Sequence, residues 1–421
     1  MQNNITEQKA NSYRGIYEQY VVDASFLWVL RSVNVKQPHY YLSDLAELEL
    51  RISDNLDGLM SSFELAWKIC LEELVYEQAG ETFTAAVIAF RSHDINKIKF
   101  IVAHGFTNEE TFKGLVSALG WLPKTIVNDW IKKFLYSKDL NHKYLAIAVS
   151  SLRRKNPGNI LNDILSREDC LENEALLARS LRLVGELKLY SLSNVVAKIV
   201  LTKNQTIKFW ANWALVLLGE YKRILNLFEF IEEDSELQLL ATEIIFKVLP
   251  IDQARIKISA LSKHPDRMRT IIHASGYLGD PYAIPWLIDK MHHIDTAKIA
   301  GEAFTLITGI DLERYNLAID TTEEIAAVPN DDDENVDMDE DENLPFPDVN
   351  KINHIWLRYR DRYHVGGRYM MGIEVSQNTP QTIDKLSALL KQVSMRQRKS
   401  VALTLALIGP QLPFINSDAK I

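Results

Sequence analysis

The sequence of 421 residues predicts an all-α fold in which short helices repeat in pairs. Glycine and proline are sparse, with 17 and 13 residues, and this composition disfavours a sheet-rich fold with many tight turns. Apolar residues recur at helical spacing along most of the chain. In the central part, the helical pattern also repeats with a period of roughly 30 residues, a length that suits one helix pair.

The first segment, residues 1–80, is expected to be helical without repeating. Residues 41–51 carry leucines at helical spacing, and Ser43 is a plausible N-cap for this helix. A second helix is expected over residues 61–77. Gly80 is well placed to end it, because glycine readily adopts the left-handed conformation found after helix C-termini.

Residues 81–309 are expected to form the repeats. Each pair has a first helix and a second helix that carries an alanine in an apolar stretch, and three of the second helices end in glycine followed by an acid. Weaker pairs are expected upstream, from residue 84 to 154. The clearest first helices begin at separations of about 35, 29, 30 and 29 residues, near Ile160, Val195, Ile224, Ala254 and Ala283.

The recurrence of helix pairs has a physical explanation. A helix pair of this size cannot bury its apolar face alone, so neighbouring pairs must stack. The alanines let adjacent second helices approach closely, and the glycines turn the chain toward the next first helix. Asp280 and Pro281 fit a helix start, with Asp as N-cap and Pro at the first helical position. Residues 81–309 are therefore expected to form a HEAT-like helical-repeat solenoid.

Residues 310–347 are expected to be an acidic loop or linker. Twelve acidic residues and no Lys or Arg lie between Asp320 and Glu342. Without them, 44 acidic residues stand against 47 Lys and Arg, so the remainder is close to neutral and unlike a nucleic-acid-binding surface. A Ca²⁺ loop of the EF-hand type needs a glycine, and none occurs between Ile310 and Asp361. The pattern favours a solvated or partner-facing acidic loop.

Residues 348–421 are expected to be helical again, with helices over about 348–363, 380–392 and 394–408. A turn-rich element follows the first of these helices and contains Gly366, Gly367, Arg368 and Tyr369. The basic run from Met395 to Lys399 could bind the acidic block of the same chain or an acidic partner.

The sequence contains no strong candidate for a catalytic, cofactor-binding or metal-binding site. Cys70 and Cys170 are the only cysteines, which excludes a disulfide framework and favours a reducing, cytoplasmic environment. His292 and His293 are adjacent and would point apart on a helix. Glu302 lies in an apolar helix, where we expect it to cap or pair with a basic residue of a neighbouring repeat. No catalytic, cofactor or metal residue is assigned.

No secretory signal or membrane-spanning segment is expected. The first ten residues are polar, and the longest apolar stretches have about eleven residues, compared with roughly 20 needed to span a bilayer.

A series of short motifs resembles an uncharacterised bacterial family of HEAT-repeat-containing proteins encoded beside type VI secretion gene clusters. The resemblance covers almost the whole chain, although residues 85–270 contribute little beyond the period, and Phe346 stands where the family favours Trp. It implies a role connected with type VI secretion, with no known activity and no catalytic residue to transfer. The motifs are residues 24–31, 45–51, 56–59, 80–83, 279–281, 285–287, 301–304, 307–309, 342–348 and 367–369.

We therefore expect a non-enzymatic, cytoplasmic scaffold that binds other proteins, as an adaptor, chaperone or accessory protein for a secretion effector or spike component. One alternative is an immunity protein that neutralises a cognate toxin. Another is a HEAT-like enzyme such as a lyase or a DNA glycosylase. No nucleic-acid binding or membrane insertion is expected, and the oligomeric state stays open. The expected partner-binding residues are Asp331, Asp332, Asp333, Asp339, Asp341, Leu344, Phe346, Trp286, Arg368 and Tyr369.

Overall fold

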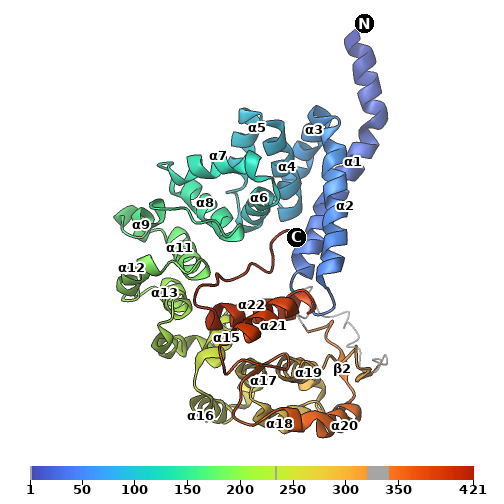
Figure 1. The fold of residues 1–421 in the computed structure, drawn as a ribbon. Helices are drawn as coiled ribbons and strands as arrows, with labels where there is room; N and C mark the ends of the chain where they lie inside the picture. The colour runs from blue at the N-terminus through green and yellow to red at the C-terminus, as the bar shows by residue number, and fades with distance from the viewer. Residues whose placement is uncertain (1, 233–234, 320–340) are drawn as a thin grey trace. The chain divides into compact units, whose positions relative to one another are not determined.

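The computed structural model describes residues 2–232, 235–319 and 341–421, with side chains from Tyr13 onward (Figure 1). Within these ranges the chain forms 22 α-helices and four strands of two residues each, so the expected all-α fold is confirmed. The chain divides into two compact units. Unit 1 comprises residues 1–36, 40–187 and 416–421, and unit 2 comprises residues 37–39 and 188–415.

Unit 1 begins with helices of different lengths that pack against one another. The long α1 (Gln2–Asn34) packs on α2 (Leu42–Met60), α3 (Phe63–Glu73) and α4 (Ala79–Ser92). Trp28 of α1 stacks on Phe83 of α4, with ring centroids 5.1 Å apart. Large aromatic side chains thus fill the space between the first helix and the start of the repeats.

The rest of unit 1 is a row of stacked helix pairs. In one row α4 packs on α6, α6 on α8, and α8 on α11. In the other row α5 pairs with α4 and α6, α7 with α8, and α9 and α10 with α11. Their bounds are Ile95–His104 (α5), Glu109–Trp121 (α6), Lys124–Leu135 (α7), Leu140–Leu152 (α8), Ile160–Ile164 (α9), Glu168–Leu171 (α10) and Glu174–Glu186 (α11).

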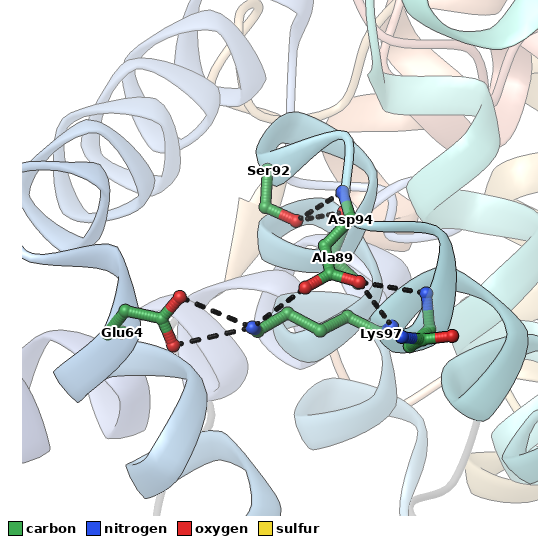
Figure 2. Close-up of polar contacts among 6 residues, drawn as sticks. Glu64, Ala89, Ser92, Asp94 and Lys97 are labelled. Carbon is green, nitrogen blue, oxygen red and sulfur yellow. Dashed lines mark hydrogen bonds and ion pairs between the residues drawn. The ribbon is translucent and has the colours of Figure 1, made fainter.

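The connection between α4 and α5 shows how the chain turns from one helix to the next within a pair (Figure 2). His93 ends α4 in the left-handed conformation, with φ of 59°. The Asp94 carboxylate then caps α5 by accepting the Asn96 N–H at 2.8 Å. Lys97 lies between this carboxylate and Glu64 of α3, at 3.1 and 3.3 Å. Local capping therefore fixes the turn, and one lysine ties it to the preceding helix.

Unit 2 contains the helices that were expected for the later repeats. Here α15 packs on α17 and α17 on α19, while α16 packs on α17, α18 on α19, and α12 on α13. The first helix expected near Ile224 is the 3₁₀-helix η3 (Tyr221–Leu227), followed by a single turn, α14 (Glu229–Glu232). The other bounds are Ser193–Ile199 (α12), Gln205–Leu217 (α13), Gln238–Val248 (α15), Ile251–Leu261 (α16), Met268–Leu278 (α17), Ile284–Lys290 (α18) and Ile294–Thr308 (α19).

The C-terminal helices belong to unit 2 and share its core. Buried side chains of α13, α15 and α17 join those of α21 and α22 in one apolar cluster. Strands β1 and β2 pair Ile319 with Phe346, and β3 and β4 form a short hairpin. The bounds are Ala318–Ile319 (β1), Phe346–Pro347 (β2), Val349–Tyr359 (α20), Tyr369–Met370 (β3), Ile373–Glu374 (β4), Pro380–Leu389 (α21) and Met395–Ile408 (α22).

Gly279 explains why the β3 hairpin can sit on the end of α17. Gly279 ends α17 with φ of 72°, and a Cβ there would lie 2.0 Å from the Tyr369 carbonyl oxygen. Its own carbonyl accepts the Tyr369 N–H at 2.8 Å. Asp280 and Pro281 start the next helical turn as expected, with the Asp280 side chain accepting the Tyr282 N–H.

Two local expectations are wrong. Ser43 is not the N-cap of α2, because the helix starts at Leu42 and the Asp44 carboxylate accepts the Tyr41 N–H at 2.8 Å. Gly80 does not end a helix, since it lies inside α4 and permits close approach of α1, where a Cβ would be 2.7 Å from the Ser25 carbonyl oxygen.

The division of the chain also differs from the four expected segments. The boundary between the units falls at residues 187 and 188, inside the segment 81–309 that was expected to be one array. In the described part of residues 310–347 there is no helix, as expected.

Candidate functional site

An exposed apolar face lies on α1. Val22, Phe26, Val29 and Val33 are 49%, 62%, 41% and 38% exposed. Their spacing of four, three and four residues places them in one line along the helix. We call these four residues the α1 seam. Single exposed apolar residues are ordinary on proteins, but a continuous line of them typically marks a binding surface.

The opposite face of α1 holds the helix in place. Val21, Ala24 and Trp28 are almost fully buried there. Burying a large apolar side chain contributes about 1.5–3 kcal/mol, so this face stabilises the packing of α1 on its neighbours.

Arg31 anchors the C-terminal end of α1 by a buried ion pair. Its guanidinium lies 2.7 Å from the Glu49 carboxylate of α2, and both side chains are less than a tenth exposed. The same guanidinium donates to the carbonyl oxygens of Asp418 and Ala419 at 3.1 and 3.0 Å. Residues at the end of the chain therefore help to orient the helix that carries the seam, with Lys420 Nζ 4.1 Å from the centre of the Trp121 ring.

Of the expected partner-binding residues, four lie outside the described residues: Asp331, Asp332, Asp333 and Asp339. Leu344 is buried in an apolar cluster of unit 2, and Trp286 packs partly against the same cluster. Phe346 is half-buried in β2.

Arg368 and Tyr369 also make contacts within unit 2. Arg368 donates to the carbonyl oxygens of Phe246 and Leu249, at 3.0 and 2.6 Å, and thereby satisfies groups at the end of α15. Tyr369 is buried between α17 and α19. The turn-rich element is held against α15 and α17, which leaves little of these two side chains for a protein partner.

Asp341 belongs to a charge cluster together with Glu302, Arg396 and the half-exposed Arg269. Arg396 Nε lies 2.7 Å from Glu302, and its Nη2 lies 2.8 Å from Asp341. Arg269 also pairs with Asp341. The expected pairing of Glu302 with a base is present, although the base comes from α22. Of the two possibilities for the basic run, the contact with the acidic block of the same chain is present between Arg396 and Asp341.

The charge cluster shifts the pKa values of its two acids in opposite directions. Burial dominates at Glu302 and raises its pKa, against the opposing charge of Arg396. Burial would also raise the pKa of Asp341, but hydrogen bonds and charge from Arg269 and Arg396 together lower it. The ionised form of Asp341 is therefore stabilised in the folded chain.

His273 lies beside this cluster and makes the stability of the fold depend on pH. Burial, with the charges of Arg269 and Arg396, lowers its pKa from 6.5 to about 3. Between these values the unfolded chain binds a proton that the folded chain does not, so stability falls as pH decreases. Lowering the pH from 7 to 5 should therefore lower the free energy of unfolding of the wild-type protein. We expect this loss to be about 2 kcal/mol smaller in His273→Gln.

Denaturant titration at both pH values measures this difference. The exposed His264 provides the matched control, and His264→Gln should leave the pH dependence unchanged. Equal losses in His273→Gln and the wild-type protein would contradict a neutral, buried His273.

Sequence reasoning missed the α1 seam and two buried lysines. Lys188 Nζ donates to the carbonyl oxygens of Leu217 and Ala406, and burial lowers its pKa to about 8. Lys247 is buried between α15, α17 and α22. The seam could have been noticed from its spacing, but both faces of α1 are apolar in this stretch, so the pattern alone does not say which face is covered.

Among the residues that the structure describes, no group of three or more His, Cys, Asp or Glu side chains is placed to hold a metal ion. In the same residues, no helix has the length and apolar character needed to cross a membrane. Comparison with protein-family models, curated proteins and solved structures found no match to this chain.

Proposed function

We propose that this protein is a scaffold that binds another protein, and that the α1 seam receives an amphipathic helix of that partner. The observation that carries the proposal is the continuous exposure of Val22, Phe26, Val29 and Val33 on a helix whose opposite face is already packed. Covering side chains of this size contributes about 1.5–3 kcal/mol each when they pass from full exposure to burial. The seam therefore offers several kcal/mol to a partner that fits it.

The spacing of the exposed positions favours a helix as the occupant. Gly15 and Gln19 precede the seam on the same exposed line and continue its alternation of three and four residues. A repeat of 3.5 residues is the geometry by which two helices pack side by side, with each side chain inserted between those of the other helix. A partner helix with apolar residues at matching positions would cover the seam along its length.

The partner is proposed to be an effector or spike component of a type VI secretion system, bound in the cytoplasm. This part of the proposal is supported by the family resemblance of the sequence motifs. In this role the protein would act as an adaptor or chaperone, and its charged surface would remain available for further contacts.

The test is co-purification from the bacterium that encodes the protein. Tagged wild-type protein should recover a secretion component, and Phe26→Asp should reduce that recovery about tenfold or more, because a desolvated carboxylate replaces the central side chain of the seam. Leu225→Asp is the matched control, since Leu225 is 61% exposed on η3, and it should recover the wild-type amount.

Three outcomes would count against the proposal. Equal recovery by Phe26→Asp and the wild-type protein would remove the seam from the binding site. Recovery of only a second copy of the chain would replace the partner by self-association. A deletion strain that secretes normally but becomes sensitive to a sibling's toxin would indicate an immunity protein.

A further inference from the structure

Unit 2 contains a cavity of about 370 Å³ that the proposed partner binding does not use. Helices α15, α17 and α22 and the β3–β4 hairpin supply its lining, which includes Lys247, Tyr277, Arg368, Met370 and Leu407. Its volume lies within the range of pockets that hold small organic molecules.

The lining of the cavity carries positive charge. Lys247 and Arg368 both line it, and none of its lining residues, all of which are described, is acidic. Arg368 is already fixed by two carbonyl oxygens at the end of α15, so its charge has a set position. An anion entering the cavity would meet the buried Lys247 and the half-buried Arg368.

The Lys247 ammonium is poorly compensated by its neighbours. It donates to Thr404 Oγ1 at 2.7 Å and to the Met370 sulfur at 3.7 Å, and a thioether is a weak acceptor. Its closest acid is Glu243, 3.8 Å away. The ring centre of Tyr277 is 5.7 Å away. A buried ammonium normally needs stronger acceptors than these.

The titration of Lys247 agrees with this geometry. Burial lowers its pKa to about 8, with Glu243 acting in the opposite direction and Arg368 in the same direction. The pKa of Tyr277 is raised well above its usual value by burial, so this phenol remains a neutral hydroxyl near neutral pH. Lys247 is therefore the group facing the cavity whose charge changes between pH 7 and pH 9.

The rest of the lining combines apolar and aromatic side chains with the polar Ser376, Asn378 and Thr404. Met370, Val375 and Leu407 are almost fully buried, and Tyr277 adds an aromatic face. The apolar and aromatic part of this surface suits the flat or short apolar body of an organic molecule.

We propose that this cavity is a binding site for a small organic carboxylate, with the carboxylate near Lys247 and the apolar body against Tyr277, Met370 and Leu407. An aromatic carboxylate with two fused rings has a suitable size and is a practical probe. The site is independent of the α1 seam, which belongs to unit 1.

Isothermal titration of the full chain with 2-naphthoate tests the proposal. We expect saturable binding with one site, and at least about tenfold weaker binding of the neutral analogue 2-naphthamide. Lys247→Met should weaken 2-naphthoate binding by a similar factor. Lys391→Met, which removes an exposed lysine of the same unit, should leave binding unchanged.

The pH dependence provides a second readout. The probe stays ionised from pH 7 to pH 9 while Lys247 loses its proton, so binding should become roughly tenfold weaker over this interval. This loss should be absent in Lys247→Met. Asn378→Trp, at an exposed residue of the lining, should block binding without disturbing the core, which circular dichroism can verify.

Equal binding of 2-naphthoate and 2-naphthamide, or unchanged binding in both Lys247→Met and Asn378→Trp, would overturn the proposal. Absence of any 2-naphthoate binding at millimolar concentration would overturn it as well.

Discussion

Replacing Arg396 with methionine is expected to lower the free energy of unfolding by about 3–5 kcal/mol, because it leaves two buried carboxylates without their shared cation. Glu302 and Asp341 are 7% and 6% exposed, and Arg396 contacts both of them, at 2.7 and 2.8 Å. Arg269 would still pair with Asp341. Glu302 would lose its ion pair with Arg396 and would have to become protonated in the folded chain. Denaturant titration at pH 7 measures the loss.

Two comparisons separate this effect from a general loss of charge. Arg396→Met combined with Glu302→Met should recover much of the stability, because a matched pair of apolar side chains replaces the buried ion pair. Arg360→Met should change the free energy of unfolding by less than about 1 kcal/mol, since Arg360 and its neighbour Asp361 are largely exposed. A loss of less than about 1 kcal/mol in Arg396→Met would show that the cluster does not stabilise the fold.

Gly114→Ala in α6 is expected to destabilise the protein by about 3 kcal/mol, although alanine is the better helix former by about 1 kcal/mol. A Cβ at Gly114 would lie 2.3 Å from the Ala79 carbonyl oxygen and 3.0 Å from the Phe83 nitrogen. Both atoms belong to the backbone of α4, so they cannot move without separating α4 from α6. Thermal or denaturant unfolding measures the effect.

Gly15→Ala is the matched control for this substitution. Gly15 is also inside a helix, and a Cβ there would meet no atom within 4 Å. The same chemical change should therefore stabilise the protein by up to about 1 kcal/mol. Effects of the same sign at both positions would contradict the close approach of α4 and α6.

The helices of the repeats were predictable from the sequence because their signals are local. The first helices expected near Ile160, Val195, Ala254 and Ala283 are α9, α12, α16 and α18. Each has its own apolar spacing, which does not depend on distant parts of the chain. The helix near Ile224 differs from these four, because η3 is a 3₁₀-helix and not an α-helix.

The buried polar groups were not predictable in the same way, because their partners are far apart in the sequence. Lys247 contacts Met370 and Thr404, which follow it by 123 and 157 residues. Arg396 contacts Glu302, 94 residues earlier. The sequence indicated that Glu302 needs a base, but only the packing of α22 on the repeats determines which one.

The expected partner-binding residues near the end of the repeats illustrate the same limit. Arg368 and Tyr369 look available in a glycine-rich turn. Their environment depends on Gly279. Because glycine has no Cβ, the β3–β4 hairpin can pack on the end of α17. Exposure is a property of the assembled helices, which is why the α1 seam became visible only in the structure.

The central claim, that the α1 seam binds a helix of a secretion partner, is tested most directly by photocrosslinking in living cells. A photoreactive p-benzoylphenylalanine at Phe26 should give a light-dependent adduct with a type VI secretion component, and mass spectrometry should place the bond on an amphipathic helix of that component. The same group at Leu225 should give no such adduct. Adducts only with a second copy of the chain, or none at Phe26, would contradict the claim.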